Sequence, residues 1–93
     1  MYLRVTRTHY DPAQHDAVTA MVGGLVDAIR QLAGCQDVLL GGDRTTGTAI
    51  SVATFDTLAH AQFPRESVGS SLLATARDLG IQIDAPEFYQ IIS

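Results

Sequence analysis

Lysine is missing from this sequence, and its six basic side chains are all arginines. Phosphate-binding loops of the Walker type and Schiff-base enzymes both depend on a lysine, so neither class fits. Acidic side chains outnumber basic ones and give a formal net charge of −4 at pH 7. Because nucleic acids and anionic membranes bind clustered positive charge, we expect neither as a partner.

Cysteine is nearly absent as well, since Cys35 is the only one. The chain therefore has no disulfide framework of its own. Its 93 residues predict one domain, spanning 1–93, and a chain of that length buries a modest core. Because 46% of the residues are hydrophobic, the sequence predicts a partner subunit that covers further apolar surface.

Long apolar runs are also lacking. No segment approaches the ~20 apolar residues that cross a bilayer. The opening MYLRV does not resemble a signal peptide, which combines a basic stretch with an apolar run of about 7–15 residues. The lone cysteine agrees with a reducing compartment, so we expect a cytoplasmic protein.

The first third of the chain predicts a strand followed by a helix. Residues 2–10 are rich in aromatic and β-branched types, which favour a strand. Asp11 and Pro12 then provide an N-cap and a first helical residue. An amphipathic stripe predicts a helix over residues 12–33, and Gly34 suits the left-handed position after it.

The middle of the chain predicts a hairpin and a broken helix. The hairpin pairs residues 35–41 with 48–55, around a connection of turn-forming residues. Asp56 is expected to cap the helix that follows. That helix is predicted in two pieces, at 57–62 and 66–79, because the proline between them cannot lie inside a helix.

A last strand is predicted over 81–83 and 87–92, with Pro86 at a bend. The order βαββαβ is the ferredoxin-like α+β arrangement, a four-stranded antiparallel sheet with two helices on one face. The strands carry apolar side chains on both faces, as Ile50 and Phe55 show within one strand. We therefore expect the helix-free face to be buried by sheet-on-sheet dimerisation.

Four segments carry a resemblance to a known superfamily: the strand MYLRVTR, the Asp11-Pro12 helix entry, the hairpin LLGGDRTTGTAISVATF and the closing LGIQIDAPEFYQII. They make the chain similar to the dimeric α/β-barrel superfamily, and most of all to small actinobacterial-type proteins grouped with the antibiotic-biosynthesis monooxygenases. The resemblance implies a homodimer whose two sheets form a barrel. It also implies a pocket in each subunit between the sheet and the helices.

The superfamily includes cofactor-independent oxygenases of aromatic polyketides or quinols, and heme-degrading enzymes. Heme degraders carry an Asn on strand one, and a Trp and a His on helix two. This chain has no Trp and no Asn, and the corresponding positions hold Thr6 or Arg7, and Ser70 or Ser71. We therefore do not expect heme degradation. The polyketide oxygenases also use Trp and Asn, so only their Arg and Tyr groups have counterparts here.

Arg7 and His9 share one face of the first strand with Leu3 and Val5. If that face meets the helices, the guanidinium would hold a phenolate or carboxylate and the imidazole would move a proton. The alternative is that both side chains lie at the strand end, partly in water.

The predicted ligand site lies between the second helix and the sheet, where the helix break at Pro64 leaves a gap. It would hold a flat, mostly apolar molecule oriented by a few polar groups. Its residues are Arg7, His9, Phe55, His60, Phe63 and Tyr89. The alternative is that both phenylalanines fill the gap as core, while the histidine is solvated and the tyrosine makes an ordinary hydrogen bond.

No metal site and no cofactor are expected. The three histidines, at positions 9, 15 and 60, lack paired-ligand spacing, and Cys35 has no second cysteine to join it. Three functions stay open: a cofactor-independent monooxygenase acting on a small aromatic or quinone-like molecule, a non-catalytic module that binds such a ligand, and a structural dimer that serves a partner protein. Fold alone does not choose among them.

Overall fold

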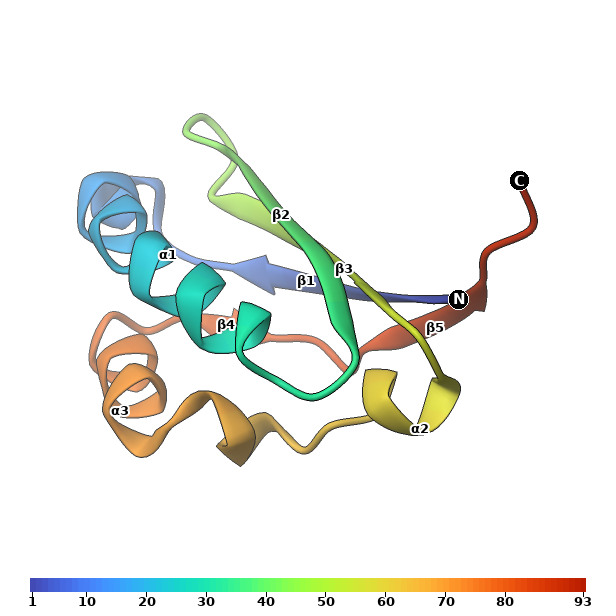
Figure 1. Ribbon diagram of the computed structural model, residues 1–93. Helices are drawn as coiled ribbons and strands as arrows, with labels where there is room; N and C mark the ends of the chain where they lie inside the picture. The colour runs from blue at the N-terminus through green and yellow to red at the C-terminus, as the bar shows by residue number, and fades with distance from the viewer.

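The computed structural model describes residues 1–93 as one antiparallel sheet with helices packed on one side (Figure 1). Strand β1 (Tyr2–His9) lies in the middle of the sheet. It pairs with β3 (Thr48–Phe55), which pairs in turn with the edge strand β2 (Cys35–Asp43). The other edge of β1 is covered by β4 (Gln82–Ile83) and β5 (Glu87–Gln90). The ferredoxin-like α+β prediction is confirmed.

The first helix is shorter than the sequence predicts. A 3-10 turn, η1 (Pro12–Gln14), precedes α1 (His15–Arg30), which ends three residues before position 33. The predicted cap is present, since the Asp11 carboxylate accepts a hydrogen bond from the Ala13 backbone N–H at 2.9 Å. Gly34 follows the helix with a φ of 78°, the left-handed conformation that glycine adopts without a steric penalty.

The second helical region is broken twice. The first break is the predicted one, where Pro64 is extended between α2 (Leu58–Ala61) and η2 (Arg65–Val68). The second was not predicted: Gly69 has a φ of 103° and separates η2 from α3 (Ser70–Asp78). An L side chain rarely adopts that conformation, so a glycine here interrupts the helix.

The predicted cap at Asp56 is wrong by one residue. The side chain of Thr57 caps α2 and accepts from the His60 backbone N–H at 3.1 Å. The Asp56 carboxylate instead binds the ring of His60. A hydroxyl reaches the third residue beyond it as readily as a carboxylate does, so the choice between adjacent Asp and Thr is not set by propensity alone.

The last strand is interrupted, as the sequence predicts at Pro86, and it ends at Gln90 rather than at residue 92. Both of its parts run antiparallel to β1, from His9↔Gln82 at one end to Tyr2↔Gln90 at the other. Proline has no backbone N–H to donate, which explains why the ladder stops around it.

The core forms where one face of β1 and β3 meets the helices. Phe55 is fully buried there, against Ile29 of α1, Val38 of β2 and Ala61 of α2. Register places Tyr2 opposite Phe55, so the even-numbered residues of β1 face the helices. Phe55 is thus the side chain on which the packing of sheet, α1 and α2 converges.

Replacing Phe55 with alanine should destabilise the fold by about 3–5 kcal/mol, the usual effect of deleting a buried phenyl ring. Urea titration followed by circular dichroism measures that loss. Ile92→Ala is the matched control, because Ile92 is 91% exposed and its truncation should change stability by no more than about 0.5 kcal/mol. Equal stability of the wild type and Phe55→Ala would contradict this account of the core.

Candidate functional site

Arg7 and His9 lie on the face of the sheet that points away from the helices. The expectation that they enter the space under the helices is therefore corrected. The reason is strand parity: the alternate residues of β1, among them Arg4 and Thr6, are opposite Ala53 and Ser51 on the helix-covered side. Side chains of both β1 faces mix polar and apolar types, so the sequence pattern did not reveal which face is inside.

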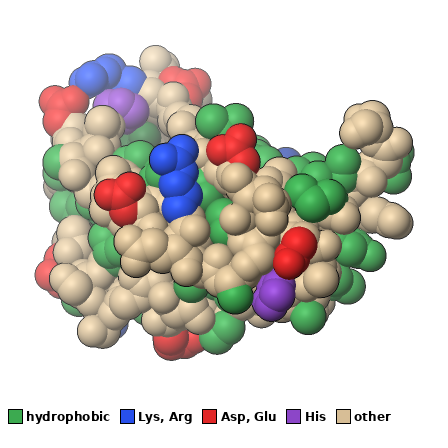
Figure 2. All heavy atoms as spheres, viewed as in Figure 1, with side chains coloured by type: hydrophobic (Ala, Val, Ile, Leu, Met, Phe, Trp, Pro, Cys, Tyr) green, Lys and Arg blue, Asp and Glu red, His purple; other side chains and the backbone are tan.

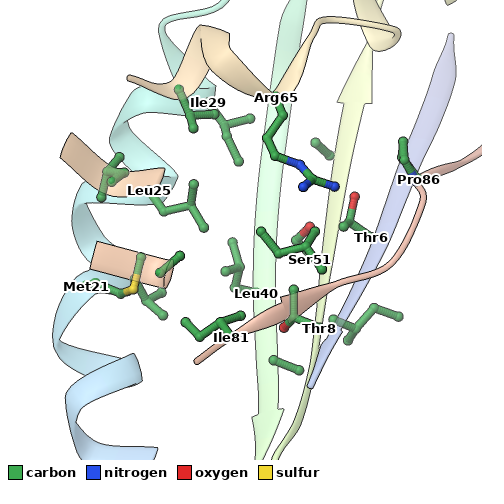
Figure 3. A pocket seen from close by; sticks show the side chains of 18 of the residues that line it. Thr6, Thr8, Met21, Leu25, Ile29, Leu40, Ser51, Arg65, Ile81 and Pro86 are labelled. Atoms are coloured by element: carbon green, nitrogen blue, oxygen red, sulfur yellow. The ribbon is translucent and has the colours of Figure 1, made fainter. Parts of the chain in front are cut away.

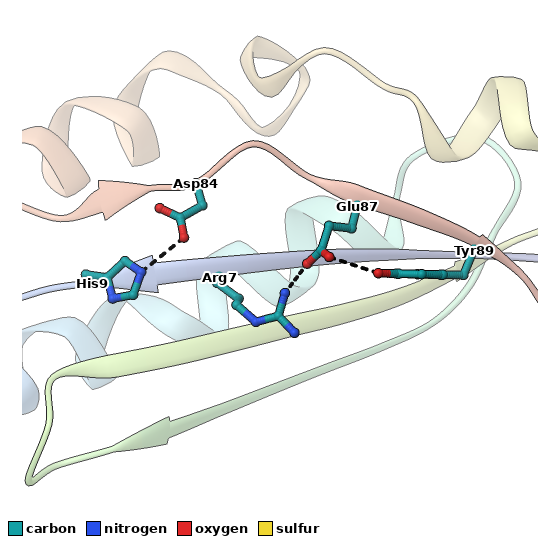
Figure 4. Close-up of polar contacts among 5 residues, drawn as sticks. All are labelled: Arg7, His9, Asp84, Glu87 and Tyr89. Atoms are coloured by element: carbon teal, nitrogen blue, oxygen red, sulfur yellow. Dashed lines mark hydrogen bonds and ion pairs between the residues drawn. The ribbon is translucent and has the colours of Figure 1, made fainter.

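The helix-free face carries two separate sets of polar contacts, which join β1 to β5 and to the residue after β4 (Figure 4). Arg7 forms an ion pair with Glu87, whose other carboxylate oxygen accepts a hydrogen bond from the Tyr89 hydroxyl at 2.8 Å. That bond raises the pKa of Tyr89. His9 Nε2 lies 3.0 Å from Asp84 Oδ2. These side chains are about half exposed, so their pairing stabilises the chain only slightly.

The two phenylalanines of the predicted site fill the space beside the helix break. Phe55 is fully buried, and its ring centroid lies 5.6 Å from that of Phe63. His60 is exposed, and its Nδ1 lies 2.7 Å from Asp56 Oδ1. The hydrogen bond to His60 lowers the pKa of Asp56. The structure thus does not bring the six predicted residues together; only Phe63 borders a cavity.

That cavity lies between the sheet and the helices, is partly open to solvent and has a volume of about 140 Å³ (Figure 3). Its walls are mainly apolar and come from α1, η2, α3 and the segment around β4. The principal apolar residues are Met21, Leu25, Ile29, Val68, Leu73 and Ile81. The floor, formed by β1 and β3, carries the hydroxyls of Thr6, Thr8 and Ser51. The position matches the pocket that the resemblance implied.

Arg4 is the half-buried cation of this cavity. Its Nη1 donates to the carbonyls of Ala61 at 3.0 Å and Phe63 at 2.7 Å. Its guanidinium carbon stacks over the Phe63 ring, 3.7 Å from the centroid. Burial, and secondarily the charge of Arg65, lower the pKa of Arg4. An arginine remains protonated in such surroundings, so a fixed positive charge lies beside an apolar space.

Arg65 is the second cation at the cavity, and its guanidinium forms no ion pair or hydrogen bond within the chain. Its side chain extends from η2 over the cavity toward the strands, on the side of Thr6 and Pro86 (Figure 3). The carboxylate of Asp84 also borders the cavity but is bound to His9. The cavity therefore has a net positive electrostatic character at one end.

Sequence reasoning missed Arg4 and Arg65. The signal for Arg4 was present in the alternation of β1, which places it with Tyr2 and Thr6. The signal for Arg65 was its position directly after the break at Pro64, where a side chain can turn into the gap.

The charged groups elsewhere offer no further site. Side chains of both signs are scattered over the face seen in Figure 2, without a basic cluster. No three His, Cys, Asp or Glu side chains lie close enough together to hold a metal ion. Burial raises the pKa of the Cys35 thiol, which keeps it protonated and unreactive near neutral pH. No helix is both long and apolar enough to cross a membrane.

Comparison with known proteins finds likeness in structure only. No family model matches the sequence, and no curated protein matches it. Among solved structures, one similar protein comes from Deinococcus radiodurans and is inferred to be an antibiotic biosynthesis monooxygenase. The two chains superpose with a TM-score of 0.75 at 16% sequence identity, and the match covers 100% of this chain and 94% of the other. A dimeric ferredoxin-like protein from an uncultured marine organism gives a TM-score of 0.76 at 13% identity, covering 100% of this chain and 96% of its own.

A third structure is SnoaB, a cofactor-independent oxygenase from Streptomyces nogalater. It gives a TM-score of 0.61 at 15% identity over 99% of this chain and 93% of its own. Identities this low establish a shared fold and leave the chemistry open. The chain thus has the ferredoxin-like fold of the antibiotic biosynthesis monooxygenase-like proteins, as its resemblance to them predicted.

Proposed function

We propose that this chain binds a small aromatic or quinone-like molecule in the cavity and promotes its oxidation by O₂ without a cofactor. The observation that carries the proposal is an apolar cavity with two arginines, Arg4 and Arg65, that have no carboxylate partner in the chain. The fold shared with SnoaB, itself a cofactor-independent oxygenase, supports the reaction class. The proposal takes residues 1–93 as one domain, located in the cytoplasm.

The arginines would favour the ionised form of the substrate. A cation beside a phenol or enol in a water-poor cavity lowers the pKa of that group, because the anion gains more from the charge than it would in water. The resulting carbanion or phenolate is electron-rich enough to reduce O₂. When a hydroquinone becomes a quinone, the substrate gives up two electrons and two protons, and O₂ is reduced to hydrogen peroxide. When a ring methylene becomes a carbonyl, the substrate gives up four electrons, one oxygen atom enters the product and the other leaves as water. In both cases O₂ takes up all the electrons, so no cofactor is required.

The cavity supplies no histidine as a base, because His9, His15 and His60 all lie outside its lining. The hydroxyls of its floor are too weakly basic to serve instead, and the Asp84 carboxylate at its border is already bound to His9. The reaction is thus restricted to substrates whose proton passes to water once the two arginines have lowered the pKa of the bound phenol or enol. The same lack of a base favours the second candidate function, a module that binds such a molecule without chemistry.

We also propose a homodimer through the helix-free face of the sheet. Part of that face is apolar and exposed, with Leu39 exposed to 68% and Ile50 to 37%. Val52 and Val5 are cross-strand partners on the same face. One structural neighbour is described as a dimeric ferredoxin-like protein, which supports this assembly.

Sedimentation equilibrium should give close to twice the chain mass of 9.9 kDa at micromolar concentration. Leu39→Asp should shift the mass to that of a monomer, because it places a charge in the apolar part of the face. Leu58→Asp, at an exposed position on α2, is the control and should stay dimeric. A folded wild-type monomer at that concentration would rule out the dimer.

Hemin should not form a stoichiometric complex with the protein. A heme exceeds a cavity of about 140 Å³, and no histidine lines it. Titration of hemin with detection at the Soret band tests this. A saturable Soret shift, followed by loss of the band when a reductant is added, would instead indicate heme degradation.

Oxygen uptake by hydroquinone should be faster with the protein than with buffer alone. Ser51→Phe should remove that acceleration, because the added ring occupies the cavity above β3. Ala74→Phe, at an exposed position of α3, is the matched control and should keep it. A Clark electrode measures the rates. Equal uptake with wild type, Ser51→Phe and buffer would overturn the oxygenase proposal and leave the binding module.

A further inference from the structure

The size of the cavity limits its ligand to about one aromatic ring. Its volume is about 140 Å³. An apolar cavity of roughly 150 Å³ in another protein holds benzene, which sets the scale. A second fused ring would exceed this volume, so it would have to protrude from the cavity into water or displace packed side chains.

The charges at the cavity select an anion. Arg65 lies close enough to Arg4 that its charge lowers the pKa of Arg4, and neither arginine has an anionic partner. One nitrogen of Arg4, Nη1, already donates hydrogen bonds to backbone carbonyls. Arg65 has all of its donors free and extends over the cavity. A carboxylate at this point would relieve the repulsion and accept paired N–H groups, the geometry that a guanidinium matches best.

The hydroxyls on the floor select further oxygens on the ligand. Thr6 and Ser51 are cross-strand partners of β1 and β3, and Thr8 is the next residue on the same face of β1. None of the three hydroxyls makes a hydrogen bond to another side chain or to the backbone. They form a short row of free donors and acceptors beneath an otherwise apolar space.

These three features describe one ligand. We propose that the cavity takes a one-ring hydroxylated aromatic acid, whose carboxylate lies at Arg65 and Arg4 and whose phenolic oxygens lie on the row of Thr6, Ser51 and Thr8. The ring fills the space between the sheet and the two long helices. The inference rests on the proposed function only in taking this cavity as the ligand site; it does not require that the ligand be oxidised.

Calorimetry under anaerobic conditions tests the charge. The probes are 2,5-dihydroxybenzoate and its neutral analogue 2,5-dihydroxybenzamide. The wild type should bind the acid at least about tenfold more tightly, as expected for a charge-assisted hydrogen bond. Arg65→Gln should abolish that preference. Arg77→Gln removes an exposed arginine of α3 that does not border the cavity, and it should leave the preference unchanged.

Two further comparisons test the hydroxyl row and the size. Thr6→Val keeps the shape of the side chain but removes its hydroxyl. It should therefore weaken the binding of 2,5-dihydroxybenzoate about tenfold and leave the binding of benzoate unchanged. The two-ring 3-hydroxy-2-naphthoate should bind more weakly than the one-ring 2-hydroxybenzoate. Tighter binding of the two-ring acid would overturn the size limit.

The outcomes separate this inference from the oxygenase proposal. If 2,5-dihydroxybenzoate binds in a way that depends on Arg65, and the protein does not accelerate oxygen uptake by hydroquinone, the inference is supported and the oxygenase proposal is refuted. Equal binding of acid and amide, a preference that survives Arg65→Gln, or no binding of any probe by folded protein would overturn the inference. Oxygen uptake by hydroquinone in those same cases would leave the oxidation standing.

Discussion

The hydrogen bonds from Arg4 to the carbonyls of Ala61 and Phe63 are the contacts on which the cavity depends. Pro64 ends α2 and leaves these carbonyls without helical partners. A side chain from the central strand satisfies both, and its stacking on the Phe63 ring fixes the chain at this point. The segment that follows, η2, is thereby held above the sheet rather than collapsed onto it.

Holding a helix break with a half-buried cation is unfavourable, because desolvation opposes its charge. A neutral donor would bind the same carbonyls at lower cost. The position of Arg65 beside Arg4 adds repulsion to that cost. Groups held at a disadvantage in the free protein are typical of binding sites, where the ligand relieves the disadvantage. This disadvantage is the reason that the proposed ligand site lies in the cavity rather than on the helix-free face.

Most of the fold could be predicted because its signals are local. The cap at Asp11, the left-handed Gly34, the hairpin and the break at Pro64 each depend on residues a few positions apart. The site could not be predicted in the same way, because it depends on which face of β1 turns inward. Leu3 and Val5 on one face and Tyr2 on the other give nearly balanced apolar content, so Arg7 and His9 were as plausible as Arg4. Only the pairing of Arg4 with Ala53 and of Tyr2 with Phe55 decides it.

The gap between β4 and β5 gives the sheet an edge without a continuous ladder at Pro86. This residue borders the cavity and also a second, shallower hollow on the surface, and both share Arg4, Phe63 and Arg65. Residues 84–86 make few backbone hydrogen bonds, a feature that segments opening locally at low free energy share. A ligand that enters here passes through the side of the subunit. Ligand entry then does not require the helix-free face to be open to solvent. The two subunits of the proposed face-to-face dimer would therefore exchange ligand without separating.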